Sequence, residues 1–352
     1  TRGAGVSVIT STRRAASTPA GSLPCMPPIR TSVGPGALPR TRPSSSLTAS
    51  LLRRLARELK GDLDLVLMTA MHADPRRRYA TAAAFADDLR RWESMTRQPN
   101  GIILVTGPTG SGKTTTLYTT LKLLATSEVN VCTIEDPIEM IEGTFNQMQV
   151  QHNIDLTFAS GVRALMRQDP DIIMVGEIRD LETAEMAIQA ALTGHLVLST
   201  LHTNDAPSAI TRLLELGVPY YLLKATLLGV MAQRLVRTLC PHCKAPVEID
   251  EGDWQALTRP WNAPLPTQTH RAVGCTECRD TGYRGRAGVY EIMLLNDGIK
   301  PLITADTDLI ALRRQAFKEG MRSLRLSGAQ KVAAGLTTIE EVLRVTPQSE
   351  QK

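Results

Sequence analysis

From Pro99 onward, short apolar runs alternate with longer segments whose apolar residues recur every three or four positions. The short runs predict buried strands at residues 102–105, 131–134, 172–175 and 196–199. The longer segments predict helices at residues 114–124, 158–167 and 181–192. Strands and helices that alternate in this order predict an α/β fold, built on a doubly wound parallel sheet with flanking helices.

The C-terminal part of the chain has a purely helical pattern. Apolar residues at helical spacing predict a helix at residues 309–320 that stops at Gly320. Thr338 and Glu341 have the spacing of a capping box, which predicts the start of a last helix. Since this region carries no residues typical of catalysis, we interpret it as a packing or subunit-contact element.

The N-terminal part has two different compositions. Residues 1–47 are rich in Ser, Thr, Pro, Gly and Arg, lack apolar periodicity and are predicted to be disordered. An unstructured tail is the favoured interpretation, and an organelle transit peptide is the alternative. Residues 48–97 regain helical spacing, from Leu51 to Met68 and again from Phe85 to Trp92, and predict a small helical module.

Charge is distributed unevenly along the 352 residues, whose formal net charge is +5. Residues 1–50 hold six arginines and no acidic residue, so +5 minus +6 leaves −1 for the rest of the chain. A nearly neutral body with only 4% aromatic residues gives no basic stacking surface, and no nucleic-acid partner is predicted. No long apolar run is free of charge, so no transmembrane helix is predicted either.

A glycine-rich loop lies between the first predicted strand and its helix. Residues 107–114 read Gly-Pro-Thr-Gly-Ser-Gly-Lys-Thr and match the phosphate-binding pattern G-x-x-x-x-G-K-[ST]. Such a loop turns backbone N–H groups toward an anion at a helix N-terminus, while Lys113 reaches the β- and γ-phosphates and the Thr114 hydroxyl binds Mg²⁺. The predicted nucleotide-binding residues are Gly107, Pro108, Thr109, Gly110, Ser111, Gly112, Lys113, Thr114 and Thr115.

Two further strands end in acidic residues. Glu177 follows the strand at 172–175, where it can order the Mg²⁺ water shell or the attacking water, and Glu135 ends the strand at 131–134 as a general base or water-positioning group. In isolation Glu177 would be interpreted as a surface residue at a strand end. Cys132, in the middle of its strand, is interpreted as a small buried apolar residue.

His195 and His202 bracket the strand at 196–200. Such residues are either structural or in contact with the γ-phosphate and the carboxylates, and their spacing alone leaves both interpretations open.

Four cysteines form two Cys-x-x-Cys pairs, Cys240 with Cys243 and Cys275 with Cys278. Four thiolates can close a tetrahedral zinc site, and a structural zinc is therefore predicted, with a redox role as the alternative. His242 is interpreted as a neighbour of this site and not as a ligand.

Together these motifs resemble one family closely. Residues 99–118, 133–139, 167–180 and 193–204 are similar, in order and spacing, to the Walker A, Asp-box, Walker B and His-box segments of the GspE/PilB secretion ATPases. These enzymes drive type II secretion or type IV pilus assembly. The resemblance covers residues 99–346 and implies a P-loop ATPase with a RecA-like sheet and a cysteine-rich subdomain, which works as a homo-hexamer in the cytoplasm against inner-membrane platform proteins.

The resemblance also implies roles for single residues. It assigns catalysis to Glu177 with support from Glu135, and sensing of the nucleotide state to His202. Arg163 and Arg167 match arginines that the family uses near the nucleotide or at the subunit interface. ATP, Mg²⁺ and Zn²⁺ are the implied cofactors. We favour type II secretion, with type IV pilus assembly or a nucleotide-binding module of little turnover as alternatives.

Residues 50–95 resemble something else, the C-terminal end of a bacterial Ser/Thr protein kinase, although the motifs of kinase chemistry are absent from the chain. A fused or misassembled gene product is one explanation. The predicted organisation is a basic tail (1–47), a helical module (48–97), an ATPase core (98–236), a four-cysteine subdomain (237–290) and a helical C-terminal region (291–352).

Overall fold

A computed structural model describes residues 82–261 and 263–347 of the chain. The predicted tail and the first part of the helical module, up to residue 81, lie outside the described residues. The second helical segment of that module is present as α3 (Ala82–Thr96).

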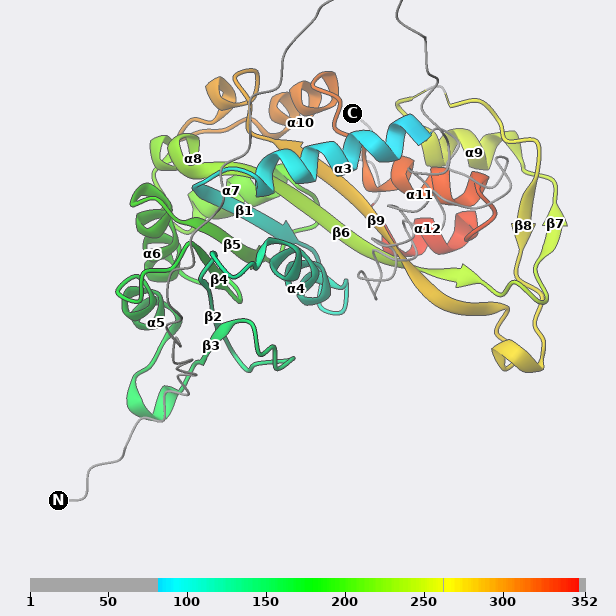
Figure 1. Ribbon diagram of the computed structural model, residues 1–352. Coiled ribbons are helices and arrows are strands. Elements are labelled where there is room, and N and C mark those ends of the chain that lie inside the picture. The colour runs from blue at the N-terminus through cyan, green and yellow to red at the C-terminus, as the bar shows by residue number, and fades with distance from the viewer. Residues whose placement is uncertain (1–81, 262, 348–352) are drawn as a thin grey trace, which may run out of the picture. The chain divides into compact units, whose positions relative to one another are not determined.

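The centre of the molecule is a seven-stranded sheet (Figure 1). Its order is β3 (Asn146–Gln149), β2 (Val131–Glu135), β4 (Ile172–Val175), β5 (Leu196–Leu201), β1 (Gly101–Thr106), β6 (Leu227–Leu239) and β9 (Tyr283–Leu294). The first six strands are parallel and β9 is antiparallel to β6. The α/β fold is therefore confirmed, but the sheet is mixed and not wholly parallel as the pattern predicted.

The four predicted strands and three predicted helices are all present, as β1, β2, β4, β5, α4 (Lys113–Leu124), α5 (Phe158–Leu165) and α6 (Leu181–Leu192). The strands β3, β6 and β9 were not predicted, because none of them is a short run of apolar residues. The strand β3 is short and largely polar, β6 carries buried Gln233 and Arg234, and β9 begins with exposed residues.

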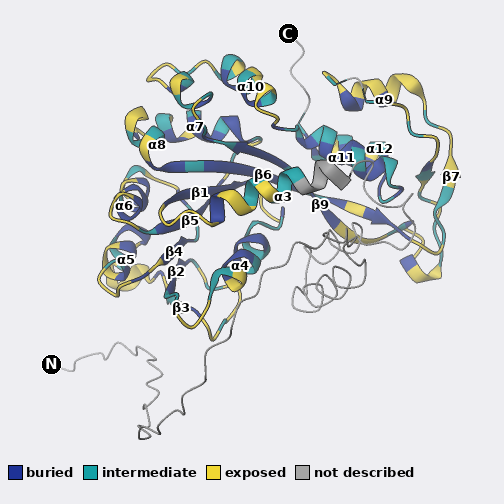
Figure 2. Cartoon of the chain, turned by 45° about the horizontal axis from the view of Figure 1, so that its top comes forward, coloured by how far each residue is buried: buried dark blue, intermediate teal, exposed yellow. Residues whose placement is uncertain are grey.

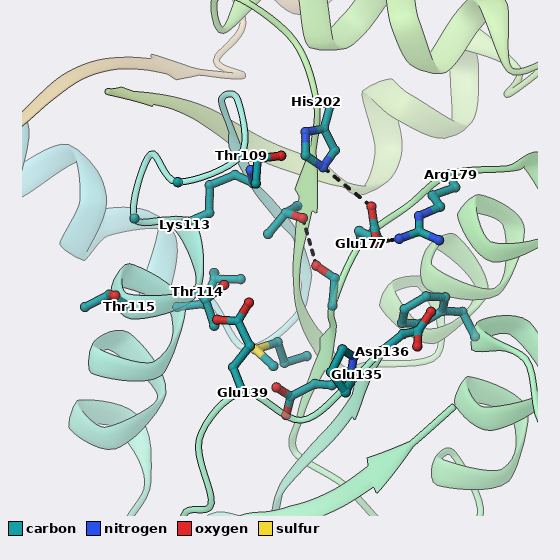
Figure 3. A pocket seen from close by; sticks show the side chains of 18 of the residues that line it. Thr109, Lys113, Thr114, Thr115, Glu135, Asp136, Glu139, Glu177, Arg179 and His202 are labelled. Atoms are coloured by element: carbon teal, nitrogen blue, oxygen red, sulfur yellow. Dashed lines mark hydrogen bonds and ion pairs between the residues drawn. The ribbon is translucent and has the colours of Figure 1, made fainter. Parts of the chain in front are cut away.

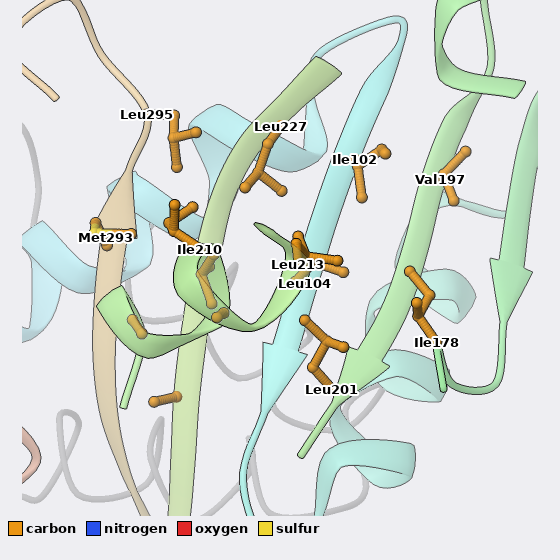
Figure 4. Packing of buried hydrophobic residues seen from close by; sticks show 14 of the residues in the cluster. Ile102, Leu104, Ile178, Val197, Leu201, Ile210, Leu213, Leu227, Met293 and Leu295 are labelled. Atoms are coloured by element: carbon orange, nitrogen blue, oxygen red, sulfur yellow. The ribbon is translucent and has the colours of Figure 1, made fainter. Parts of the chain in front are cut away.

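Helices cover both faces of the sheet. Alternate residues of β1 point to opposite faces and pack into two different hydrophobic clusters. Ile102 and Leu104 pack in a cluster that includes residues of α5, α6, α7 (Pro207–Glu215) and α8 (Tyr220–Thr226). Figure 4 shows both side chains on the same side of the sheet as Ile210 and Leu213 of α7. Ile103 and Val105 face the second cluster, which includes residues of α3 and α4. The strand β1 is consequently buried along its whole length (Figure 2).

Five further elements lie toward the far ends of β6 and β9 (Figure 1), and they are β7 (Ala245–Val247), β8 (Thr269–Arg271), α9 (Glu251–Thr258), α11 (Leu324–Ala333) and α12 (Ile339–Val345). The helix α10 (Leu309–Lys318) contacts α7 instead. Short 3₁₀ turns are formed at His152–Ile154, Thr276–Cys278 and Lys300–Leu302. The helices α11 and α12 contact β6. In the described part of the chain, no helix has the length and apolarity needed to cross a membrane.

The predicted capping box of α12 is only half formed. The Thr338 hydroxyl accepts from the backbone N–H of Glu341 at 3.3 Å, as expected of an N-cap. The Glu341 carboxylate does not return the bond, because it accepts from Arg237 and Arg344 instead. The residue that should close the cap thus ties the last helix to β6.

Candidate nucleotide-binding site

The loop between β1 and α4 has the curvature that the sequence predicts. Gly107, Gly110 and Gly112 have φ angles of 151°, 76° and 86°, a region that residues with a side chain rarely adopt. Gly112 is the N-cap of α4 and provides no side-chain cap, so the first N–H groups of this helix are left for another acceptor. A bound anion is the acceptor that such a helix end favours.

Lys113 is the first residue of α4 and folds back over the loop. Its Nζ donates to the carbonyl oxygens of Gly107 at 2.9 Å and Pro108 at 3.1 Å. Burial lowers the pKa of Lys113, whereas the nearby carboxylate of Glu177 acts in the opposite direction. The ammonium is therefore held at the loop, opposite an acidic group.

Glu177 forms the opposite side of the site. Its Oε1 is paired with the guanidinium of Arg179, and its Oε2 lies 3.5 Å from Nε2 of His202 (Figure 3). Glu177 follows β4 and His202 follows β5, so the carboxyl ends of two adjacent parallel strands bring them together. Burial and the positive charge of Lys113 lower the pKa of His202, which favours its neutral form.

Between these two sides lies a cavity of about 490 Å³. Nine of the predicted site residues line it, and they are Thr109, Gly110, Gly112, Lys113, Thr114, Thr115, Glu135, Glu177 and His202. Gly107, Pro108 and Ser111 belong to the same loop without lining the cavity. The hydroxyl of Ser111 is buried and has no hydrogen-bond partner within the described residues.

Glu135 lies at the base of the cavity and is held by neutral donors. The Tyr118 hydroxyl donates to its carboxylate, at 2.7 Å from Oε2, and the Thr133 hydroxyl donates to Oε1 at 2.7 Å. The amide of Gln147 reaches Oε1 at 3.3 Å. Only 3% of Glu135 is exposed, so this carboxylate is fixed in one orientation and not free to turn toward a distant group.

Three predicted residues lie elsewhere. His195 lies at the amino end of β5, where its Nδ1 is 2.8 Å from the carbonyl oxygen of Ala190, and it does not line the cavity of its own chain. The length of the strand, about 3.3 Å for each residue, separates it from His202. Arg163, in α5, is exposed with Nη2 3.6 Å from Met186 Sδ, and Arg167 is exposed just after that helix.

The structure also reveals lining residues that the sequence did not single out. They include Asp136, Glu139, Arg179 and Arg286. Arg179 lies two residues after Glu177 and pairs with its carboxylate. A basic residue so near an acidic residue at a strand end is the sequence signal that points to it. Arg286 comes from β9, whose position beside β6 is not visible in the sequence.

The four predicted cysteine ligands meet at one point. All four Sγ atoms lie within 4.8 Å of one another, with 3.9 Å between Cys240 and Cys275, 3.8 Å between Cys243 and Cys278, and 3.7 Å between Cys275 and Cys278. A tetrahedron with Zn–S bonds of about 2.3 Å has S···S edges of about 3.8 Å. The cysteines are free, and this group can hold a metal ion.

The expected role of Cys132 is confirmed, because it is fully buried in β2 and burial raises the pKa of its thiol. It takes no part in the four-cysteine group.

Comparison with known proteins is consistent with this geometry. The family described as type II/IV secretion system protein matches residues 65–344. The chain is 63% identical over 259 residues to the type IV pilus assembly ATPase TfpB of Acinetobacter baylyi, covering 74% of this chain and 44% of that protein. It is 53% identical over 259 residues to the type II secretion system protein E of Pseudomonas aeruginosa, covering 74% of this chain and 51% of that protein.

Among solved structures, the crystal structure of the pilus retraction motor PilT with bound ADP is similar, with a TM-score of 0.54 and 30% identity over 72% of this chain and 63% of that chain. The chain spans about half the length of the two relatives named above, 44% and 51%. The family match starts at residue 65, inside the segment that resembles a kinase end, and the comparisons do not support that kinase resemblance.

Proposed function

The chain belongs to the type II/IV secretion system protein family, and we propose that it is an ATP-hydrolysing motor of that family. One observation carries the proposal. The phosphate loop with Lys113 and the carboxylate of Glu177 line the same cavity from opposite sides. Phosphoryl transfer to water needs both a cradle for the phosphates and a group that orients and deprotonates the water, and this cavity offers both.

The residues of the loop fit a nucleoside triphosphate. The uncapped N–H groups at the start of α4 and the ammonium of Lys113 would hold the phosphates, and the Thr114 hydroxyl would hold Mg²⁺. Bound Mg²⁺ neutralises charge on the phosphate oxygens. To meet the phosphates, Lys113 exchanges its two loop carbonyls for anionic oxygens, which are stronger acceptors.

Glu177 is the proposed base. Its carboxylate would accept the proton of the attacking water, while the ion pair with Arg179 and the contact with His202 fix its direction. A neutral His202 can accept or donate at Nε2 as the phosphate changes, which suits a sensor of nucleotide state. Glu135 would support the site from below, held by Tyr118 and Thr133.

Turnover would require more than one copy. Arg163 and Arg167 are exposed and do not line the cavity of their own chain, so we assign them to the phosphates of a neighbouring subunit in a homo-hexamer. The same observation favours a second candidate function, a nucleotide-binding module with little turnover until it assembles. Phosphate release that is absent in dilute protein and rises with protein concentration would indicate turnover that depends on assembly. ATP binding without phosphate release at any protein concentration would indicate a binding module alone.

The four cysteines would hold a structural zinc, because their spacing fits a tetrahedron of thiolates. We place the protein in the cytoplasm at the inner membrane, with platform proteins as partners. The identity of 63% to a pilus assembly ATPase, against 53% to a type II secretion protein, favours pilus assembly over the secretion role that the sequence suggested. Restoration of pili, but not of secretion, in strains lacking the respective ATPase would test this.

A further inference from the structure

Two polar residues are buried side by side in β6, next to the phosphate loop. Gln233 is 1% exposed and Arg234 is 5% exposed. Thr106, the last residue of β1, pairs with Ala232, so Gln233 lies beside the point where the loop begins. A buried polar residue in a central strand costs free energy unless its groups are bonded, so the partners of this pair are informative.

Gln233 uses both ends of its amide on the phosphate loop and on α4. Its Nε2 donates to the carbonyl of Ser111 at 2.8 Å, and its Oε1 accepts from the Thr116 hydroxyl at 2.8 Å. Ser111 belongs to the loop, and Thr116 lies in the first turn of α4 after Lys113. The side chain therefore links the loop to the start of the helix without touching the cavity itself.

The glycines of the loop make this approach possible. A Cβ atom on Gly112 would lie 2.8 Å from Nε2 of Gln233, and one on Gly107 would lie 2.5 Å from the carbonyl oxygen of Gln233. Both distances are too short for real Cβ contacts. The loop therefore packs directly against Gln233. This close approach is a second reason, besides the φ angles, why both positions require glycine.

Arg234 extends the link to the loop after β5. Its Nη1 donates to the carbonyl of Gln233 at 2.9 Å, and its Nη2 donates to the carbonyl of Asn204 at 2.8 Å. Asn204 lies two residues after His202. On the same loop, the N–H of Thr203 donates to the Thr106 hydroxyl at 2.8 Å. Both walls of the cavity are therefore anchored to β1 and β6.

We propose that Gln233 is a positioning residue that holds the phosphate loop in its anion-binding shape before nucleotide arrives, with Arg234 tying the His202 loop to the same strand. This inference rests on the proposed function, since it concerns the same site. A loop that is already shaped loses less freedom on binding, so the amide acts on nucleotide affinity and not on the chemical step.

Substitutions at both ends of the amide test this. Gln233→Glu keeps an oxygen for Thr116 but places a second oxygen against the Ser111 carbonyl. We expect the Kd of a fluorescent ADP analogue to rise about tenfold, and the KM for ATP to rise with it, while kcat at saturating ATP stays within about twofold. Thr116→Val replaces the hydroxyl by a methyl group and should raise the Kd about threefold. Thr116→Ser keeps the hydroxyl and should bind the analogue with the Kd of the wild type.

Controls separate the possible outcomes. Gln189→Glu makes the same chemical change at an exposed position of α6 and should leave the Kd unchanged. The proposal is overturned if folded Gln233→Glu and Thr116→Val both bind like the wild type. It is equally overturned if neither variant folds by circular dichroism, since the pair would then serve stability alone. A wild-type chain that binds no nucleotide would refute the proposed function itself.

Discussion

Glu177 and His202 face each other from the ends of two adjacent strands, with 3.5 Å between Oε2 and Nε2. Burial and the positive charge of Lys113 together lower the pKa of His202. A neutral His202 leaves the Glu177 carboxylate available, whereas a protonated one would compete with water for it. This relationship makes the site sensitive to pH.

ATP hydrolysis should therefore fall on the acidic side. The pKa of His202 is lowered from 6.5, so the ring is neutral at pH 7 and gains its proton only as the pH falls below 6.5. We expect kcat/KM to decrease in that range and the decrease to be shallower in His202→Gln. Phosphate release by the wild type and by His202→Gln is measured from pH 5 to pH 8, a range that brackets the usual histidine pKa of about 6–7. An equal decrease of kcat/KM at acidic pH in both proteins would show that His202 does not cause it.

Glu341 should be a stability residue with its own pH window. Burial alone would raise the pKa of this carboxyl, but hydrogen bonds from Arg344 and Arg237 outweigh burial and bring the pKa to about 2. A lowered pKa stabilises the fold above the ordinary value of 4.5, and this contribution is lost as the pH falls from 4.5 toward 2.

Glu341→Ala should thus lower the free energy of unfolding by about 3 kcal/mol at pH 7, because it also leaves the half-exposed Arg237 without its buried partner. Denaturant titration at pH 7 and at pH 3, about the middle of the acidic window, measures the difference in free energy of unfolding between the wild type and Glu341→Ala. This difference should be smaller at pH 3. Glu340→Ala, at the exposed neighbouring position, is the control. Equal stability of both variants at pH 7 would contradict the assigned role of the Arg237 and Arg344 contacts.

The four-cysteine group should bind one zinc ion per chain. Thiolates at S···S separations of 3.7–3.9 Å match a tetrahedral site, whereas a disulfide needs about 2.05 Å. Elemental analysis should find about one zinc in the wild type and in Cys132→Ala, and far less in Cys275→Ser. Chelation should lower the Tm of the wild type. Two disulfides and no zinc would favour the redox alternative.

Arg163 should act across a subunit boundary, because its side chain is exposed and absent from the cavity of its own chain. Arg163→Ala and Lys113→Ala should each lose ATP hydrolysis. A mixture of the two variants should regain part of it, since some boundaries then combine an intact loop with an intact arginine. Phosphate release that stays at the level of the separate variants would place Arg163 outside the reaction.

The sequence predicted those parts that follow from local pattern. The strand, loop and helix around Lys113 are one continuous segment, and the carboxylate and histidine that follow β4 and β5 belong at the same sheet edge in any parallel α/β fold. The four cysteines were paired by spacing alone. These features depend only on short-range order and on one rule of topology.

Other features depend on contacts that span the chain. The antiparallel pairing of β9 with β6 brings Arg286 to the cavity, and no local pattern reveals it. The amide of Gln233 donates to the phosphate loop, a contact between residues 122 positions apart in the chain that no local pattern indicates. His195 has the same spacing from its strand as His202, yet the direction of β5 places it at the opposite edge.

One cavity is expected to bind ATP at Lys113 and to hydrolyse it with Glu177. The decisive measurement is Mg²⁺-dependent phosphate release by the assembled wild-type chain, compared with Lys113→Ala and Glu177→Gln. We expect both variants to lose release by a factor of about 100 or more, with nucleotide binding lost only in Lys113→Ala. Unchanged phosphate release in both variants would show that this cavity does not hydrolyse ATP.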